Sequence, residues 1–440
     1  MPVHYRSLDN GLKVVVSPDS SVPTATVAVY YNIGFRIEPR DRTGFAHLFE
    51  HMMFQGSANL GKTEFIKLVQ GNGGVLNGST RFDFTNYFEV VPAHKLETML
   101  WAEADRMRGL DITQDNLVNQ QGVVTNEVKV NVLNRPYGGF PWLDMPQYAN
   151  ENWYNAHNFY GDLDDINAAT LTDVQAFFDT FYSPNNAVLV VVGDVDVEGT
   201  FGLVEKYFGD IPATDLPPIA DISEPRQTKA KRFSKTDALA PKPAIALAWH
   251  MPERGTPEYF AMGVIEQVLL QGSDSLLHKR VVNDKGYTDR VFGGINMLGN
   301  MYNYNGPMIF TAAIIHNAEI DADQIIDEVE QTIERLRTTP LGDAELERAK
   351  VKLRSGFYDT VGGSTKFGTA DLLASFALFD DDPSRINRLE SEFDAVDAAV
   401  IQRTVREYLR PTNRTVLTIE PGQAQAAPGN GNGSGNGGGQ

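Results

Sequence analysis

The sequence predicts an α+β protein in which one unit, a mixed and mostly antiparallel sheet with helices packed on it, is made twice. Short runs of β-type residues alternate with longer amphipathic runs, which is typical of this class. The motif Phe-Gln-Gly-Ser at 54–57 recurs as Leu-Gln-Gly-Ser at 270–273, and each copy closes a run with helical periodicity. The segment YSPNNAVLVV at 182–191 likewise has a counterpart, LRPTNRTVLT, at 409–418.

The two matches keep a similar spacing, which favours an internal duplication over chance. Gly56 and Gly272 lie 216 positions apart, and Pro184 and Pro411 lie 227 positions apart. One short match would be weak evidence, but two matches near opposite ends of a unit indicate a repeat. We therefore predict two α/β domains of related fold.

Two segments interrupt the repeated pattern and suggest where the domains end. Residues 213–232 contain prolines and lack an amphipathic period, which is typical of a linker. Residues 421–440 are rich in Gly and Asn and carry no charge, which predicts a flexible tail. The predicted organisation is an N-terminal domain at 1–212, a linker, a homologous C-terminal domain at 233–420, and the tail.

The elements of the first unit are predicted from the period of their apolar residues. Alternating or continuous apolar runs of about four to eight residues indicate strands, whereas apolar residues three or four positions apart indicate helices. The predicted strands are 12–17, 25–31 and 188–192. The predicted helices are 43–55, 62–71, 93–107, 114–133, 171–182 and 198–208.

Composition excludes several classes of protein. The 440 residues include no cysteine, which excludes disulfides and Cys-ligated metals. The formal net charge is −19 without a Lys/Arg-rich block, which argues against a nucleic-acid partner.

No apolar run reaches the ~18 residues of a membrane helix. The first residues lack the apolar core of a secretory signal, so we expect a cytoplasmic protein as the sequence stands, or a periplasmic one if a signal was removed.

The helix predicted at 43–55 has one apolar face and one face of metal-binding type. Its apolar residues follow the spacing i, i+3, i+4, i+7, i+8: Phe45, Leu48, Phe49, Met52 and Met53. His47, Glu50 and His51 gather on the opposite face. Two imidazoles at i and i+4 lie side by side, as two ligands of one zinc ion do, and Glu50 lies beside them within reach of a zinc-bound water. The order His-x-x-Glu-His is the inverted form of the common zinc-protease motif.

A tetrahedral catalytic zinc site needs a third protein ligand and one open position. The other histidines form no local pair, so a carboxylate is the expected third ligand. The helix predicted at 114–133 offers Glu127, with Gln120 and Asn131 on the same face. Periodicity alone does not dismiss the rival carboxylates, which are Glu89, Glu97 and Glu103.

The run DRTGFAHLFEHMMFQGS at 41–57 resembles the pitrilysin/insulinase family of zinc metallopeptidases, particularly the short-chain subfamily related to mitochondrial processing peptidase. The likeness continues through GNGGVLNGSTRFDFTNYFEVVP, SPNNAVLVVVGDVD and LGDAELERAK, and so covers nearly the whole chain apart from the tail. The resemblance implies that Glu127 is the third zinc ligand, that Glu50 is the general base, and that the chain forms half of a clamshell chamber. It also implies that an extended peptide pairs with the edge strand formed by Asn77, Gly78, Ser79 and Thr80.

The sequence departs from the family pattern near the predicted metal site. Catalytic members usually carry a second Glu two helical turns before the ligand Glu, and this chain has Gln120 there. Gln120 can donate hydrogen bonds but brings no charge, so we expect it to support the site more weakly. In the second unit the metal positions are Gly263 and Gln267, so we expect no zinc there.

A second departure concerns an Arg and a Tyr, seven positions apart, that family members carry in the C-terminal half. Val282 and Asp289 occupy those positions, while Arg280, Tyr287 and Arg290 are near but out of register. In two-chain members of the subfamily, the subunit without zinc supplies such residues. The resemblance therefore implies a zinc-bearing subunit that works with a homologous partner chain.

Three interpretations of function follow. The first is a Zn²⁺-dependent endopeptidase that cleaves unfolded peptides in a closed chamber formed with a partner subunit. The second is a homodimeric or self-sufficient peptidase in which Tyr287 or Arg280 replaces the missing pair. The third is a scaffold subunit of the same fold, without activity or with weak activity.

Overall fold

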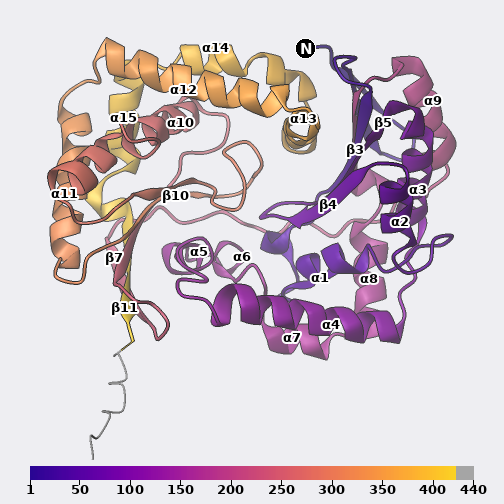
Figure 1. Cartoon of the computed structure of the whole chain (residues 1–440), viewed down its shortest axis with the longest axis horizontal. Coiled ribbons are helices and arrows are strands. Elements are labelled where there is room, and N and C mark those ends of the chain that lie inside the picture. Colours follow the sequence, from indigo (N-terminus) through magenta and orange to yellow (C-terminus); the bar gives the residue numbers. More distant parts are fainter. Residues whose placement is uncertain (423–440) are drawn as a thin grey trace, which may run out of the picture.

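The computed structural model describes residues 1–422, and these form two sheets with helices packed around each (Figure 1). The first sheet has the order β1-β2-β6-β3-β5-β4 and the second the order β7-β11-β8-β10-β9. The strands of the first sheet are β1 (His4–Ser7), β2 (Lys13–Pro18), β3 (Thr24–Tyr31), β4 (Val75–Thr80), β5 (Thr85–Pro92) and β6 (Ala187–Gly193). Those of the second are β7 (Lys231–Asp237), β8 (Ala244–His250), β9 (Phe292–Ile295), β10 (Ile309–Ile315) and β11 (Arg414–Pro421).

Each half of the chain contributes its own helices. The first half of the chain forms α1 (Phe45–Met52), α2 (Glu64–Gly71), α3 (Leu96–Arg108), α4 (Gln114–Val128), α5 (Asp144–Ala149), α6 (Trp153–Ala156), α7 (Leu163–Ala168), α8 (Leu171–Phe181) and α9 (Val197–Phe208). The second half forms α10 (Pro257–Leu269), α11 (Ala322–Thr338), α12 (Asp343–Gly362), α13 (Phe367–Phe379), α14 (Leu389–Asp394) and α15 (Ala398–Tyr408). Helix α5 nonetheless packs on the second sheet and α13 on the first. Within the described residues, no helix is long and apolar enough to cross a membrane.

Apart from the additional edge strand β1, the two sheets share one topology, which confirms the predicted duplication. In each sheet the first long strand pairs in parallel with the last strand of its half, β2 with β6 and β7 with β11. The remaining neighbours are antiparallel in both sheets, in the equivalent orders β6-β3-β5-β4 and β11-β8-β10-β9. The predicted class, a mixed and mostly antiparallel sheet with helices made twice, is confirmed.

The strands predicted at 12–17, 25–31 and 188–192 form with ends that differ by at most one residue. The helix predicted at 114–133 is longer than the α-helix that forms. Helix α4 ends at Val128, and Lys129–Leu133 continue it as a π-helical stretch. No helix or strand forms between Phe208 and Lys231, where the linker is predicted. The predicted tail falls almost entirely on 423–440, outside the described residues, and the domain boundaries themselves stay a prediction.

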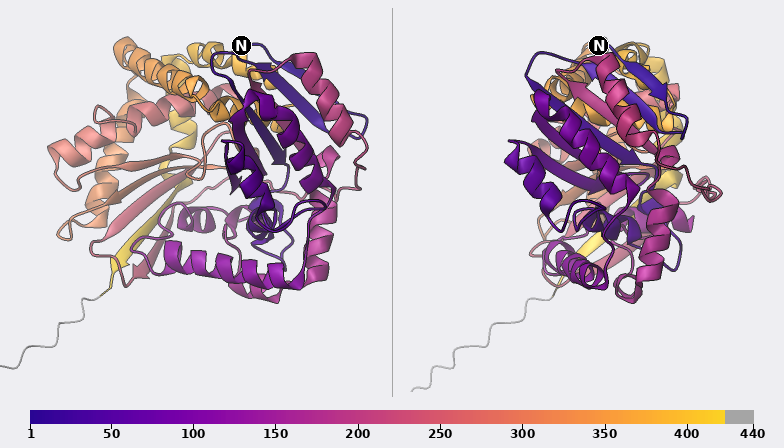
Figure 2. Two further views of the ribbon diagram at one scale, coloured as in Figure 1. Left: turned by 45° about the vertical axis from the view of Figure 1, so that its right-hand side comes forward. Right: turned by 90° about the vertical axis from the view of Figure 1, so that its right-hand side faces the viewer.

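The central strands of the first sheet are buried on both faces, which explains their nearly continuous apolar sequence. Along β3, Val27, Val29 and Tyr31 point into a core shared with the helices of the first half. Ala28 and Tyr30 point the other way, into a core that is continuous with the second half. In Figures 1 and 2, α3 and α9 lie along the outer side of this sheet, whereas α13 of the second half lies along its inner side.

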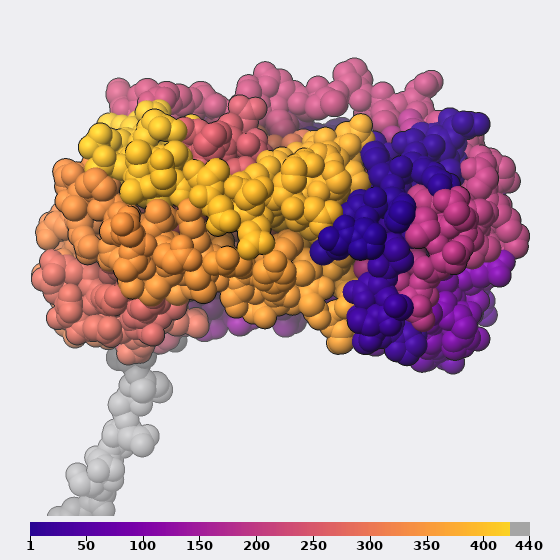
Figure 3. All heavy atoms as spheres, turned by 90° about the horizontal axis from the view of Figure 1, so that it is seen from above, coloured from indigo at the N-terminus to yellow at the C-terminus, as the bar shows by residue number. Residues whose placement is uncertain are grey.

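Helix α13 joins the two halves. The ring of Phe367 stacks on Phe88 with ring centroids 3.8 Å apart. Tyr30 Oη donates a hydrogen bond of 2.8 Å to Asp371 Oδ1. Seen from above, the orange and yellow C-terminal segments lie directly against the indigo N-terminal strands (Figure 3). The two sheets are therefore held in a fixed arrangement by contacts between residues more than 250 positions apart.

A buried ion pair strengthens the same junction. The Arg36 side chain is fully buried, and its Nε donates to Asp83 Oδ1 at 2.6 Å. Asp83 Oδ2 also accepts the backbone N–H of Asn305 at 2.7 Å and that of Gly306 at 3.3 Å. Asp83 thus neutralises the arginine of one half and binds a loop of the other.

We predict that Asp83→Ala lowers the free energy of unfolding by about 3–5 kcal/mol, because it leaves Arg36 buried without a counter-charge. Urea unfolding followed by circular dichroism measures the change. Asp210→Ala, which removes the partner of the exposed Arg108 instead, should leave the unfolding midpoint close to that of the parent chain. Equal destabilisation by both substitutions would contradict the claim that Asp83 stabilises the contact between the two halves more than an exposed ion pair does.

Candidate metal centre

The buried carboxylate of Glu38 binds the first peptide N–H groups of helix α1. Glu38 accepts hydrogen bonds from the N–H of Gly44 at 2.8 Å and of Ala46 at 2.5 Å. Gly44 adopts a φ of 81°, a conformation that favours glycine, and so turns the chain into the helix. The apolar residues of α1, including Leu48 and Phe49, are fully buried in the core of the first half. This packing fixes which way the polar face of α1 points.

Helices α1 and α4 pack together and bring three metal-binding side chains to one point. His47 Nε2 lies 3.7 Å from Glu127 Oε1, and His51 Nε2 lies 3.3 Å from Glu127 Oε2. The two imidazole rings stand 4.9 Å apart and nearly perpendicular, at 85°. One ligand atom from each of these residues can be chosen so that all three lie within 4.8 Å of one another. Among the described residues, this is the one such group of His, Asp and Glu side chains.

The donor set fits zinc. Burial, together with the nearby His51, lowers the pKa of His47 to about 4, so its imidazole is neutral at neutral pH and keeps a lone pair for a metal. The contact with His51 lowers the pKa of Glu127, which keeps that group a carboxylate. Two imidazole nitrogens and one carboxylate oxygen are a ligand set that Zn²⁺ takes in catalytic sites, where a fourth position stays open.

Glu50 lies next to this cluster and faces strand β4. Its Oε2 accepts a hydrogen bond of 2.8 Å from Thr80 Oγ1. Burial raises the pKa of Glu50 above its ordinary value, against the opposing effect of the Thr80 hydrogen bond. Gly78 passes so close that a Cβ on it would lie 3.3 Å from Glu50 Cγ. A carboxyl group with a raised pKa, beside an open strand, is suited to exchange protons with a bound substrate.

The four predicted substrate-binding residues, Asn77, Gly78, Ser79 and Thr80, lie on β4 at the edge of the first sheet. Within the described residues, β4 pairs on one side only, with β5. Asn77 is exposed, and Gly78 and Ser79 are half-buried. The free side of this strand can therefore accept another extended chain.

Tyr160 is a residue of this site that sequence analysis missed. Its Oη donates a hydrogen bond of 3.1 Å to Glu127 Oε1. Its ring packs against His47 with centroids 5.1 Å apart. Tyr160 precedes α7 and lies in no periodic element, so no pattern in the sequence marks it. The hydroxyl group fixes the orientation of the Glu127 carboxylate, as partners of metal ligands commonly do.

Gln120 is buried on α4, as its helical position predicts, but its amide donates to Asn119 Oδ1 at 2.8 Å. No hydrogen bond joins Gln120 to His47, His51 or Glu127 in the described part of the chain. His47 Nδ1 is buried there without a hydrogen-bond partner. The His47 ring is thus held by packing, and the support of the site by Gln120 stays a prediction.

The structure separates Glu127 from its three rivals. Glu89 and Glu103 are fully buried and pair with Arg106 inside the first half. Glu97 is exposed and pairs with Lys206 of α9 at 2.9 Å. None of the three approaches the two histidines, so geometry selects Glu127 where periodicity left the choice open.

The residues near the missing Arg/Tyr pair do not approach the metal cluster either. Arg280 pairs with Glu328 of α11, and Figure 1 shows α11 on the far side of the molecule from α1. Tyr287 packs against the core of the second half. Arg280 is therefore not placed to act on the same site within one chain.

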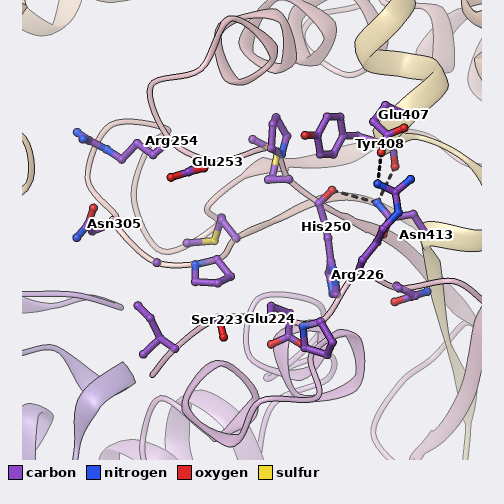
Figure 4. Close-up of a pocket in the computed structure, with 18 of the residues that line it drawn as sticks. Ser223, Glu224, Arg226, His250, Glu253, Arg254, Asn305, Glu407, Tyr408 and Asn413 are labelled. Atoms are coloured by element: carbon purple, nitrogen blue, oxygen red, sulfur yellow. Dashed lines mark hydrogen bonds and ion pairs between the residues drawn. The ribbon is translucent and has the colours of Figure 1, made fainter. Parts of the chain in front are cut away.

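A cavity in the second half lies away from the cluster. It measures about 660 Å³ and lies between residues 220–227, the end of β8 and the end of α15 (Figure 4). Two of its arginines form ion pairs, Arg226 with Glu407 and Arg254 with Asp380. Its lining includes neither the metal-binding residues nor Glu50.

Comparison with known proteins agrees with this geometry. Residues 13–138 match the family model described as insulinase (peptidase family M16), and residues 168–353 match the one described as the peptidase M16 inactive domain. The chain belongs to peptidase family M16. The first match contains the metal cluster and Glu50, whereas the second extends from α8 into α12. The family resemblance expected from the motifs is confirmed.

Family members of known name include peptidases of bacteria and mitochondria. The zinc protease PqqE of Helicobacter pylori is 27% identical over 427 residues, which are 96% of this chain and 94% of that protein. The β subunit of the mitochondrial-processing peptidase of Saccharomyces cerevisiae is 21% identical over 370 residues, 81% of this chain and 78% of that subunit. The crystal structure of a protease from Helicobacter pylori superposes with a TM-score of 0.88 at 26% identity, covering 96% of this chain and all of that one.

We predict that Tyr160→Phe lowers the affinity for zinc about tenfold, because Glu127 loses the hydrogen bond that orients it. Competition against a chromophoric chelator measures the dissociation constant. Tyr154→Phe is the matched control, since the Tyr154 ring packs on Arg40 instead. An unchanged affinity in Tyr160→Phe would show that packing alone holds Glu127.

Proposed function

We propose that this M16 protein is a zinc-dependent endopeptidase that hydrolyses peptide bonds in unfolded peptides or short polypeptides. The proposal rests on one observation, which is that three features of the structure lie side by side. These are a two-histidine, one-carboxylate cluster, a further carboxyl group at Glu50, and the open edge of β4 beside it. A metal site alone would suit many functions, but a metal site beside an unpaired strand suits cleavage of an extended chain.

In the proposed mechanism, His47, His51 and Glu127 hold the metal, and Tyr160 orients Glu127. Bound Zn²⁺ would supply a Lewis acid that acidifies water and polarises a carbonyl group. Glu50 takes a proton from the attacking water on a carboxylate oxygen, and Thr80 Oγ1 steadies that carboxylate. Glu50 then delivers the proton to the nitrogen of the leaving amine.

The substrate is proposed to bind as an added strand on β4, along Asn77, Gly78, Ser79 and Thr80. Backbone pairing reads no particular side chain, so this mode suits many sequences provided that the peptide is extended. Folded proteins do not expose such a segment. Selection for unfolded peptides then follows from the strand geometry and from closure of the chamber.

We propose that a homologous partner subunit completes the chamber and supplies the Arg and Tyr that this chain lacks at Val282 and Asp289. The mitochondrial relative is itself named as one subunit of a processing peptidase, which supports this arrangement. A homodimer is the alternative. Every copy in a homodimer carries Val282 and Asp289, so the pair would be missing, and Arg280, one of its possible replacements, is bound to Glu328.

The second candidate function is a scaffold subunit with weak activity or none. The buried His47 Nδ1 without a partner, and Gln120 in place of a Glu, favour this reading. A chain that binds zinc but cleaves nothing, alone or with a partner, would establish it.

We predict that Glu50→Gln keeps stoichiometric zinc but lowers the cleavage rate of a quenched fluorescent peptide about 10²–10⁴-fold, because proton transfer is lost. His51→Ala and Glu127→Ala should lose the zinc itself. Glu64→Gln, a substitution of the same kind on the exposed face of α2, is the control and should cleave like the parent chain. Unchanged cleavage in Glu50→Gln would reject Glu50 as the general base.

We predict that peptide cleavage rises when the chain is mixed with a homologous chain that carries Arg and Tyr seven positions apart but lacks His-x-x-Glu-His. Size-exclusion chromatography with light scattering should show a one-to-one complex. The matched control is that partner with its Arg and Tyr replaced by Val and Asp, as in this chain. If this chain alone cleaves the peptide as fast as the mixture does, the two-subunit arrangement is rejected.

The compartment stays a prediction. The cytoplasm and the periplasm are the two candidates, and fractionation of cells with an antibody against the chain distinguishes them.

A further inference from the structure

A second cavity, of about 330 Å³, lies in the second half between α10, α12 and the loop after β9. Its walls combine polar groups with apolar side chains, among them Tyr302, Leu353 and Phe357. One carboxyl group, that of Glu266 on α10, lies in this lining. The cavity shares no residue with the metal cluster, and the peptidase function does not use it.

The internal duplication shows what this cavity derives from. The spacing of 216 positions between Gly56 and Gly272 carries Glu50 onto Glu266. The same spacing carries the two histidines onto Gly263 and Gln267. Helices α10 and α12 pack together as α1 and α4 do in the first half. The second half has therefore lost the metal ligands and kept a carboxyl group at the place of the general base, with a cavity in front of it.

Glu266 lacks a counter-charge. Its Oε1 accepts a hydrogen bond of 2.9 Å from Gln271 Nε2, and a backbone hydrogen bond from Ile295 also lowers its pKa, but Glu266 forms no ion pair with any residue in 1–422. Lys352 also lines the cavity, but its ammonium group is bound to Asp274 and to the carbonyl oxygen of Gln271. Burial raises the pKa of Glu266 to about 7, which shows how poorly the surroundings stabilise its charge.

The backbone is shaped around this carboxyl group. Gly294 on β9 has a φ of 146°, and a Cβ at that position would overlap Glu266 Oε1. Gly356 on α12 lines the same cavity, and a Cβ there would meet no atom within 4 Å. The first glycine makes room for the carboxyl group, and the second leaves space in front of it.

We propose that this cavity binds the protonated amino or guanidinium group of a ligand, with Glu266 as its counter-ion. The apolar side chains of the walls would hold the carbon chain of the ligand, and the rings of Tyr302 and Phe357 would attract the cation through their faces. The group could belong to a free alkylamine or to a basic side chain of a polypeptide. Binding here is separate from catalysis, so the proposal stands whether or not the first half cleaves peptides.

Isothermal titration calorimetry of the zinc-loaded chain tests the proposal, in phosphate buffer because Tris is itself an amine. The probes are n-butylamine, with n-butanol as its uncharged control, and acetyl-Ala-Ala-Lys-Ala-Ala-amide, with the norleucine peptide as its control. At least one amine probe should bind one-to-one, and Glu266→Gln should weaken that binding about ten- to a hundredfold. Binding of butylamine alone identifies a small amine as the ligand, and binding of the lysine peptide alone identifies a polypeptide side chain.

A second variant tests the cavity without touching the carboxyl group. Gly356→Leu should fill the space and abolish binding, while Gly362→Leu, on the same helix but outside the cavity, should bind like the parent chain. Zinc content and the melting temperature verify that each variant is folded. The proposal is overturned if neither amine binds, if the uncharged controls bind equally well, or if Glu266→Gln and Gly356→Leu leave binding unchanged.

Discussion

The site depends on one constraint, which is that the apolar face of α1 has to be buried. Leu48 and Phe49 are fully covered by the core of the first half, and Glu38 fixes where the helix begins. With these contacts made, the helix cannot rotate, so His47 and His51 face α4 and Glu50 faces β4. The two histidines, Glu50 and the edge of β4 are thereby brought to one place by the packing of an eight-residue helix.

Sequence alone predicted the half of the site that lies on α1. A helical period fixes which side chains share a face, so the two histidines and Glu50 follow from local spacing. The predicted strands also formed, because both faces of the central strands are buried and their apolar runs are strong signals. The helical period placed Glu127 on the helix predicted at 114–133, but it could not exclude Glu89 or Glu103 as the third ligand. Those two carboxylates are distinguished by a buried arginine, Arg106, whose position no local pattern reveals.

The contacts that sequence could not predict are those between distant segments. Asp371 of α13 bonds to Tyr30, and Asp83 bonds to the loop at Asn305, because the second half folds back onto the first sheet. Tyr160 reaches Glu127 from a loop with no period at all. The duplication was visible as two short matches, and their spacing places Glu266 at the position of Glu50. The cavity beside Glu266 was hidden from motif analysis, since a single glutamate carries no motif.

The central claim is that His47, His51 and Glu127 hold one zinc ion between α1 and α4. Crystals of the purified chain, with diffraction collected on both sides of the zinc absorption edge, test it most directly. We predict one anomalous peak, at about 2.0–2.2 Å from Nε2 of each histidine and from a carboxylate oxygen of Glu127. A zinc peak at any other group of side chains, or none in a zinc-supplemented crystal, would contradict it.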